Sequence, residues 1–303
     1  MIDYSALRAV AMIVQSGSFE KAARALNVTP SAISQRVKHL EERLGAVLIE
    51  RGSPCTATEK GDWLCRHIEQ VGMLERDLLA ELPALADAED PAQKVTLHLA
   101  TNADSLGTWF LKAISQFSKA SDYLFNIAVD DQDHTAEWLQ RGRVVAAVTS
   151  LSRPVQGCRI TPLGILQYRA TASPEFIARH FPNGITRETI ASAPALTFNQ
   201  KDRLQDQWVQ ATIADDAVCP THWLPSTQAF VDASLSGMGW GMNPVQLVGE
   251  HLKTGRLVEL IPDTPLDVPL FWQVNRLVAD RLARLTQAVV TTARRELAPL
   301  PDE

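Results

Sequence analysis

The stretch between Ser18 and Leu44 constrains the fold more than any other part of this chain. Its first half carries apolar residues at the spacing of one helix face: Phe19, Ala22, Ala23 and Leu26. Ser18 can cap that helix, because its hydroxyl accepts a hydrogen bond from a free backbone N–H. Asn27 tolerates the left-handed backbone of a tight turn, and Thr29 followed by Pro30 is typical of a second helix start. The stretch therefore predicts two short helices joined by a turn.

The second of these helices has two different faces. Its apolar stripe must pack on a core and consists of Ile33, Val37, Leu40 and Leu44. Its polar face consists of Ser31, Ser34, Gln35 and Lys38. Hydroxyls, an amide and a cation can pair with base edges and phosphates in a major groove, which predicts a helix-turn-helix. An ordinary helical hairpin with a solvated face has the same periodicity, so periodicity alone leaves both interpretations open.

The same stretch resembles the N-terminal domain of LysR-type transcriptional regulators. The matching residues are Phe19, Ala22, Ala23, Leu26, Ser31, Ile33, Ser34, Val37, Leu40, Glu41, Gly45, Arg51, Thr58 and Gly61. The resemblance implies a winged helix-turn-helix that binds double-stranded operator DNA, a homodimer that assembles into a homotetramer, and contact with RNA polymerase. The DNA-binding residues that it implies are Ser31, Ser34, Gln35, Arg36, Lys38 and Arg51.

A supporting helix and a wing are predicted on either side of the helix-turn-helix. The supporting helix has one apolar face, formed by Leu7, Val10, Ala11 and Val14, and ends at Gly17. The wing follows at 47–54, where Arg51 can reach a minor groove or a phosphate; the alternative is an ordinary surface arginine. The chain departs from the common family pattern twice. Pro30 replaces a frequent glutamine, and Pro54-Cys55 replaces a second wing arginine, which weakens minor-groove reading.

A long helix is predicted from the cap at Thr58 to about Leu82. Its apolar residues advance by threes and fours, close to a coiled-coil seam: Leu64, Ile68, Val71, Leu74, Leu78 and Leu82. A helix of this length needs a partner for its stripe, and the resemblance implies the equivalent helix of a second chain. Packing against the chain's own body is the alternative. The Pro- and Ala-rich segment 83–91 is predicted to be a hinge.

Composition is that of a soluble globular protein with room for two or three domains. The chain has 303 residues, of which 46% are hydrophobic, and lacks both a long apolar run and a signal pattern, so we expect it in the cytoplasm. Its four cysteines lack metal or disulfide spacing, and no metal or cofactor is expected. Net charge is −6, yet residues 1–60 carry eight basic and six acidic residues. Positive charge is therefore concentrated where phosphates would be met.

From residue 94 the pattern changes to alternating strands and helices. Strands are predicted at 95–100, 124–129, 144–149, 168–172, 195–198, 239–242 and 269–274, and helices at 104–119, 135–141, 175–180, 202–213, 227–235 and 276–297. A βαβαβ order predicts a mainly parallel sheet, and a second such unit would follow it. The last strand would return to the first sheet. These elements predict two α/β lobes with a cleft between them.

The predicted fold class is therefore α+β and multidomain, with a periplasmic-binding-protein-like effector domain as the family resemblance implies. The predicted divisions are a winged helix-turn-helix at 1–58, a linker helix and hinge at 59–91, and an effector-binding domain at 92–303. Within that domain, lobe I comprises 92–165 and 268–303, and lobe II comprises 166–267.

Ligands of open α/β sheets lie beyond the carboxyl ends of the strands, near helix N-termini. The polar residues predicted there are Thr101, Asn102, Asp104, Ser105, Asp130, Asp131, Asp133, Thr149, Ser226 and Thr227. Donors for a carboxylate beside acidic groups for a cation suit a basic amino acid. The alternatives are a carboxylate that stabilises a helix dipole at Asp104 and a solvated turn at Asp130. The residues alone favour those alternatives.

Two further segments, Leu99–Leu111 and His180–Arg187, resemble the ArgP/LysG branch of the family, as does the run Thr56–Gly61. This branch responds to lysine and arginine, so the resemblance implies L-lysine or L-arginine as effector and activation of a basic amino acid exporter gene. An enzyme is not expected, because the Gly-rich run Ser234–Gly241 has no P-loop lysine and the histidines are dispersed. A sequence-tolerant DNA-binding protein that controls replication, or a family member with a different effector, remains the alternative.

Overall fold

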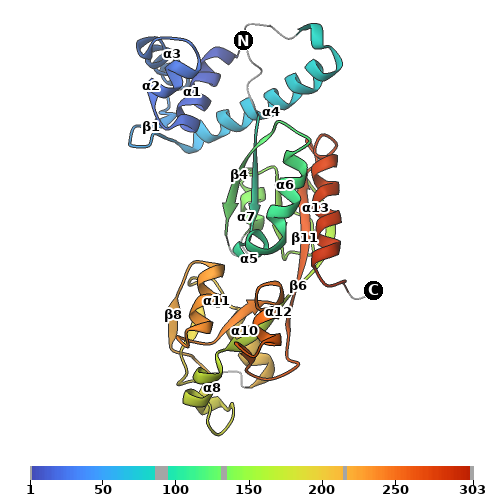
Figure 1. Ribbon diagram of the computed structural model, residues 1–303. Coiled ribbons are helices and arrows are strands. Elements are labelled where there is room, and N and C mark those ends of the chain that lie inside the picture. The colour runs from blue at the N-terminus through green and yellow to red at the C-terminus, as the bar shows by residue number, and fades with distance from the viewer. Residues whose placement is uncertain (1, 86–94, 131–134, 214–216, 301–303) are drawn as a thin grey trace. The chain divides into compact units, whose positions relative to one another are not determined.

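The structure is a computed structural model that describes residues 2–85, 95–130, 135–213 and 217–300. The chain forms two compact units, Met1–Thr96 with Asp122–Leu124, and Leu97–Ser121 with Phe125–Glu303. The first unit contains helices α1 (Tyr4–Ser16), α2 (Phe19–Ala25), α3 (Pro30–Leu44) and α4 (Glu59–Glu81), strands β1 (Ile49–Glu50) and β2 (Thr56–Ala57), and the short helix η1 (Pro83–Leu85) (Figure 1). The hinge predicted at 83–91 lies largely outside the described residues.

Local capping sets the boundaries of the first unit's helices as predicted. The Ser18 hydroxyl accepts from the backbone N–H of Lys21 at 3.4 Å, and the Thr29 hydroxyl accepts from that of Ala32 at 3.2 Å. Asn27 adopts the left-handed conformation, with φ of 51°. The apolar faces of α1 and α3 meet in one core, to which Leu7, Val10, Ile13, Ile33, Val37, Leu40 and Leu48 contribute.

The wing consists of the antiparallel pair β1–β2, which packs against the start of α4. Thr58 caps α4 by accepting from the N–H of Gly61 at 3.2 Å, and its own hydroxyl donates to the carbonyl of Val47 at 2.8 Å. A Cβ at Gly61 would overlap the carbonyl oxygen of Leu48, so only glycine allows this close approach. The wing and the long helix are thus fixed to each other by one capped turn.

The second unit is built around a seven-stranded sheet. Its strands are β3 (Thr96–Thr101), β4 (Leu124–Val129), β5 (Ala146–Thr149), β6 (Cys158–Ala172), β9 (Gly241–Pro244), β10 (Val258–Glu259) and β11 (Leu266–Asn275). The order is β10-β6-β11-β5-β3-β4, with β9 also paired to β6. A separate parallel pair joins β7 (Ala195–Thr197) to β8 (Thr221–Trp223).

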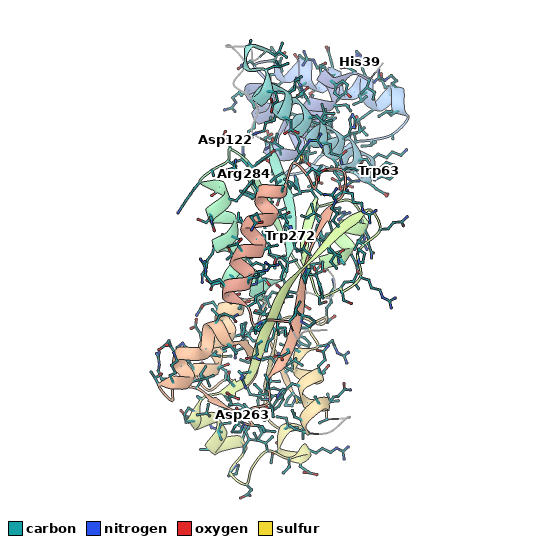
Figure 2. All side chains as sticks on the ribbon, turned by 90° about the vertical axis from the view of Figure 1, so that its right-hand side faces the viewer. His39, Trp63, Asp122, Asp263, Trp272 and Arg284 are labelled. Carbon is teal, nitrogen blue, oxygen red and sulfur yellow. The ribbon has the colours of Figure 1, made fainter. Side chains whose placement is uncertain are left out.

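Helices cover this sheet in both lobes. Lobe I carries one continuous helical run, α5 (Ala103–Ser105), η2 (Leu106–Phe110) and α6 (Leu111–Ser118), together with α7 (Thr135–Gln140) and α13 (Ala283–Glu296). Lobe II carries α8 (Pro174–His180), α9 (Arg187–Ile190), α10 (Leu204–Thr212), α11 (Thr227–Leu235) and α12 (Val245–Lys253). The buried indole of Trp272 on β11 donates to the hydroxyl of Thr286 on α13 at 3.1 Å, which ties that helix to the sheet (Figure 2).

Strands β6 and β11 run through both lobes, which differs from the prediction of two separate βαβ units (Figure 1). We predict a strand only from residue 168, but β6 begins at Cys158 and pairs antiparallel with β11 along its length. Pro162 and Gly164 hide this strand in the sequence, because both residues usually interrupt strands. They are accommodated at an irregularity in register opposite Leu270 and Phe271. The predicted lobe boundaries therefore fall inside continuous strands.

Two other elements differ from the sequence-based expectation. The last helix begins at Ala283 rather than at 276, because the Asn275 side chain accepts from the N–H of Leu277 and starts a series of turns. In lobe II the pairing of β6 with β9 is antiparallel, whereas the sequence predicts a second mainly parallel unit there. The return of the strand at 269–274 to the first sheet is confirmed by the pairing of β11 with β5.

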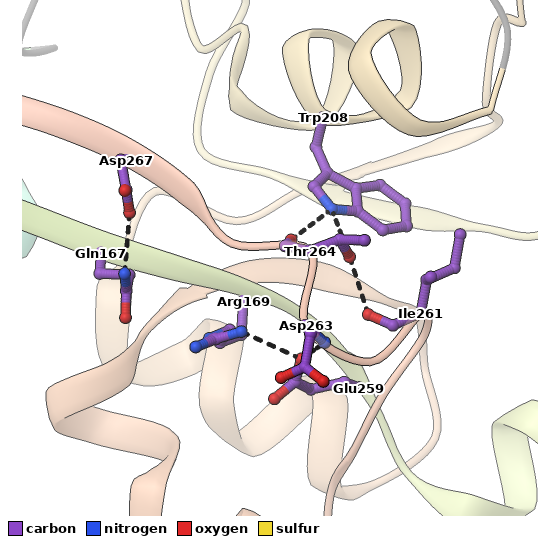
Figure 3. Close-up of polar contacts among 8 residues, drawn as sticks. All are labelled: Gln167, Arg169, Trp208, Glu259, Ile261, Asp263, Thr264 and Asp267. Carbon is purple, nitrogen blue, oxygen red and sulfur yellow. Dashed lines mark hydrogen bonds and ion pairs between the residues drawn. The ribbon is translucent and has the colours of Figure 1, made fainter.

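Polar contacts brace the two long strands where they enter lobe II (Figure 3). The Gln167 amide on β6 donates to Asp267 on β11 at 2.9 Å, and Arg169 forms an ion pair with Glu259 on β10 at 3.3 Å. The Trp208 indole of α10 donates to the carbonyl of Thr264 at 2.9 Å and so holds the turn between β10 and β11. The part of the sheet that connects the two lobes is therefore held by side-chain hydrogen bonds and an ion pair, unlike a loose linker.

Candidate functional sites

The polar face of α3 is presented to solvent as the sequence predicts. Ser31, Gln35 and Lys38 are exposed, and Ser34 and Arg36 are half-buried. Ile33 and Val37 are fully buried on the opposite side. Lys38 lies 3.7 Å from Glu42 one turn later, a fully solvated pair that costs little to break. This face is therefore available to a major groove.

Arg51 extends from the wing toward the start of α2. Its guanidinium lies 5.1 Å from the centre of the Phe19 ring, which restricts the side chain without neutralising its charge. Cys55, in the Pro54-Cys55 pair of the wing, is buried, and its N–H donates to the carbonyl of Gly17 at 2.9 Å. In this chain the second half of the wing thus contributes to the core.

The apolar stripe of α4 divides into two parts. Leu64 and Ile68 pack against the core of the winged helix-turn-helix. Farther along, the side chains of Leu74 and Leu78 are 50% and 51% exposed, and Trp63 is 61% exposed near the helix start. One guanidinium nitrogen of Arg8 on α1 contacts both carboxylate oxygens of Glu75, at 2.9 and 3.0 Å, in a half-exposed ion pair between α1 and α4. The exposed half of the stripe is the part that a second chain could cover.

A pocket between the lobes lies at the strand ends where the sequence places ligand chemistry. Of the predicted residues, Asn102, Asp104, Asp130 and Thr227 line it. Thr101, Ser105, Thr149 and Ser226 do not line it: the first three are buried within lobe I, and Ser226 caps α11. Asp131 and Asp133 lie outside the described residues. The lining that sequence reasoning missed is Ala103, Phe198, Asp202, Leu204, Phe230, Met242, Asn243 and Pro244.

Asp104 is held by hydroxyl groups from two other elements. The Tyr168 hydroxyl on β6 donates to its Oδ2 at 2.7 Å, and the Thr227 hydroxyl at the start of α11 donates to its Oδ1 at 2.7 Å. Burial raises the pKa of Asp104 above its usual range, and these two hydrogen bonds together oppose that effect only in part. The contact with Thr227 also joins lobe I to lobe II.

Two further carboxylates complete the acidic side of the pocket. Asp130 accepts from the Trp138 indole at 3.1 Å and lies 3.3 Å from the Lys201 ammonium. Asp202 accepts from the backbone N–H groups of Phe198 and Leu204, at 2.9 and 3.0 Å. Burial raises the pKa of Asp202 as well. Among the described lining residues there is no lysine or arginine, so the pocket presents three carboxylates without a basic residue in its wall.

Two features are absent from the residues that the structure describes, a cluster of metal-binding side chains and a membrane-spanning helix. Within 2–85, 95–130, 135–213 and 217–300, no group of three His, Cys, Asp or Glu side chains is arranged to hold a metal ion. None of the helices in those ranges combines the length and apolar character needed to cross a bilayer.

Comparison with known proteins defines the class of this chain. The bacterial regulatory helix-turn-helix protein, lysR family, matches residues 4–62, and the LysR substrate binding domain matches residues 92–298. The chain therefore belongs to the LysR family of DNA-binding transcriptional regulators. The resemblance inferred from the helix-turn-helix residues is confirmed.

The particular relatives lie in the branch that the sequence indicates. The chain is similar to the transcriptional regulator ArgP of Pseudomonas fluorescens, with 40% identity over 99% of this chain and 100% of that protein. It is 67% identical to the C-terminal domains of a LysR family protein from Agrobacterium tumefaciens, which cover 68% of this chain and 100% of that one with a TM-score of 0.67. Full-length LysG of Corynebacterium glutamicum with bound effector Arg is 33% identical, covers 98% of this chain and 100% of that one, and has a TM-score of 0.67.

Proposed function

We propose that this regulator responds to L-lysine or L-arginine and activates a gene for export of basic amino acids. The observation that carries the proposal is a pocket lined by three carboxylates, Asp104, Asp130 and Asp202, to which the half-exposed Lys201 adds one positive charge at Asp130 from outside the lining. A buried cation without a partner costs several kcal/mol, so such a pocket favours a ligand that brings positive charge. The arginine bound to the related LysG supports the same ligand class.

The ligand's three charged groups can be assigned to different parts of the pocket. Asp104 would meet the α-ammonium, and Asp130, at the end of β4, would meet the cation of the side chain. The α-carboxylate would accept hydrogen bonds near Asn102 and Thr227, where the helical run that starts at α5 and helix α11 begin. Phe198, Leu204 and Phe230 would pack on the ligand's methylene groups.

On DNA, helix α3 would enter the major groove with Ser31, Ser34, Gln35, Arg36 and Lys38. Arg51 of the wing would contact the minor groove or a phosphate. We assign residues 1–58 to DNA binding, 59–91 to dimerisation through α4 and the hinge, and 92–303 to effector binding. The predicted dimerisation stripe is Leu64, Ile68, Val71, Leu74 and Leu78; of these, Leu74 and Leu78 are exposed and would meet the second chain, whereas Leu64 and Ile68 pack on the chain's own core. The dimer would assemble into a homotetramer, which sums several weakly basic heads on one operator. The protein would act without catalysis or cofactor, in the cytoplasm, in contact with RNA polymerase.

Thermal denaturation of the full-length protein with each of the twenty amino acids tests the effector class. A ligand that binds only the folded state raises the melting temperature, so lysine or arginine should do so and neutral amino acids should not. Calorimetry of Asp104→Asn and Asp130→Asn then tests the two assigned carboxylates. Each substitution should weaken binding of the basic amino acid and leave operator binding intact. Stabilisation by a neutral or acidic amino acid instead would overturn the proposal.

A further inference from the structure

An ion pair occupies the carboxylate of the proposed effector pocket at which a ligand cation would be placed. Lys201 of lobe II directs its ammonium to Asp130 of lobe I, with 3.3 Å between Nζ and Oδ1. We propose that Lys201 is a built-in competitor for the effector's side-chain cation and thereby sets the effector concentration to which the protein responds. This inference rests on the proposed function, because it concerns the same pocket and ligand class.

Asp130 is a fixed anchor in this pair. Its backbone N–H donates to the carbonyl of Thr101 at 3.2 Å, which holds the end of β4 against β3. The Trp138 indole donates to Oδ2 at 3.1 Å, while Oδ1 faces the lysine. The Asp130 side chain is 22% exposed, so its carboxylate is less hydrated than that of a surface residue and its interaction with a cation is less weakened by salt. Whatever cation occupies Oδ1 therefore meets a group that is already in position.

The backbone of Lys201 lies in a hydrogen-bonded turn, while its side chain is half-exposed. The Asn199 side chain accepts from the N–H groups of Lys201 and Asp202, at 2.7 and 3.2 Å. Asp202 in turn accepts from the N–H of Phe198 and of Leu204, which closes the turn on both sides. The lysine side chain itself is 50% exposed, so its ammonium can leave Asp130 and become hydrated without disturbing the fold.

The Lys201 ammonium that binds Asp130 is the same chemical group as the side-chain cation of a lysine effector. The Lys201 ammonium repels a ligand cation at Oδ1 of Asp130, so the ligand binds best in the fraction of molecules from which Lys201 has withdrawn. The apparent dissociation constant is the intrinsic one divided by that competent fraction. Loss of the Lys201 charge should therefore tighten binding of basic amino acids. A neutral amino acid makes no demand on Asp130, so its binding should not change.

A different role for Lys201 predicts the opposite result. If its ammonium held the ligand's α-carboxylate, removal of the charge would weaken binding of every amino acid. The geometry favours competition, because Lys201 is paired with Asp130.

Calorimetric titration of the full-length protein with L-arginine, L-lysine and norleucine decides between these roles. Lys201→Met retains much of the side-chain length and removes the charge. Lys253→Met is the matched control, because it removes the same charge from an exposed ion pair with Glu250. Lys253 is the last residue of α12, whereas the pocket residue Pro244 precedes the first residue of that helix. A partly exposed ion pair should give tightening of roughly 2- to 5-fold for both basic amino acids with Lys201→Met and none with Lys253→Met. The gain should vanish when Asp130→Asn is added.

The outcomes separate the two proposals. If the wild type binds arginine or lysine but Lys201→Met binds them equally or more weakly, the competitor role is overturned and the proposed function stands. If the wild type binds neither, both fall together. Melting curves of both variants, expected to match the wild type without ligand, exclude misfolding as the cause of any change.

Discussion

At the residue scale, Asp104 should make the effector-binding unit sensitive to pH. Burial raises its pKa in the folded protein, so its charged form costs stability above that pKa and the cost disappears as pH falls through it. Asp104→Asn removes the charge. The variant should melt higher than the ligand-free wild type at pH 8, by roughly 2–4 °C for each kcal/mol relieved. This difference should shrink as pH is lowered through the raised pKa of Asp104 toward the ordinary range of a carboxyl group, as calorimetric scans across pH would show. A difference independent of pH would contradict the assignment.

The polar face of α3 offers a paired test of DNA recognition. Gln35→Ala should cost roughly 1–3 kcal/mol on the operator and relax preference at one base position, because glutamine can read an adenine edge. Lys38→Ala should weaken binding to all sequences alike and reduce the salt slope by about one unit, because lysine neutralises a phosphate. Fluorescence anisotropy with operator and random DNA at several salt concentrations measures both. Equal losses on both DNAs for Gln35→Ala would remove it from base reading.

Some residues of the proposed effector pocket can be predicted from the sequence. Asp104 and Asp130 follow predicted strands of the first sheet, so a rule about strand ends identifies them. Asp202 follows β7 in the same manner, and the same rule applied to the second lobe could have found it. Asn243 lies within β9 and reaches the pocket because β9 pairs antiparallel with residues 168–171 of β6, a contact that local pattern does not encode.

At the element scale, the exposed half of α4 predicts where the dimer forms. Leu74→Glu combined with Leu78→Glu places two charges on the exposed stripe, so the oligomer should dissociate while the helix-turn-helix stays folded. Light scattering measures the mass, and Leu277→Glu, at an exposed leucine of the other unit, serves as control. Ile68→Glu should instead unfold the head, because Ile68 packs on its core. Unchanged mass of the double variant would place the interface elsewhere.

Elements bounded by local chemistry were predictable, and elements bounded by distant contacts were not. Helices α2 and α3 begin at the caps Ser18 and Thr29, as the sequence predicts. Helix α13 begins seven residues later than its periodicity indicates, since the turns after Asn275 bury Val278 and Leu282 at helix-like spacing. Periodicity reports which residues are buried, and here the buried residues include those of a turn.

At the scale of the whole molecule, the effector unit should work without the DNA-binding unit. Residues 92–303 contain the complete sheet and every described residue of the pocket. This fragment should bind arginine with the affinity of the full-length protein, as calorimetry would show, and should not bind operator DNA. An affinity lower by tenfold or more would mean that the first unit contributes to the pocket. The sequence predicts this two-part organisation, but not the continuity of β6 and β11, because it is set by pairing across about a hundred residues.

Because β6 and β11 are continuous and paired, lobe II can be exchanged as a single inserted segment. The chain enters it along β6 and leaves it along β11, and Tyr168 and Leu266 at this border are direct partners across the two strands. A segment whose two ends are held side by side can be exchanged for another with the same spacing, as in domain insertion. Grafting the corresponding segment of a relative between these strands would alter half of the pocket wall in one step. Evolution, or an engineer building biosensors, can therefore retune what the protein senses without touching the part that reads DNA.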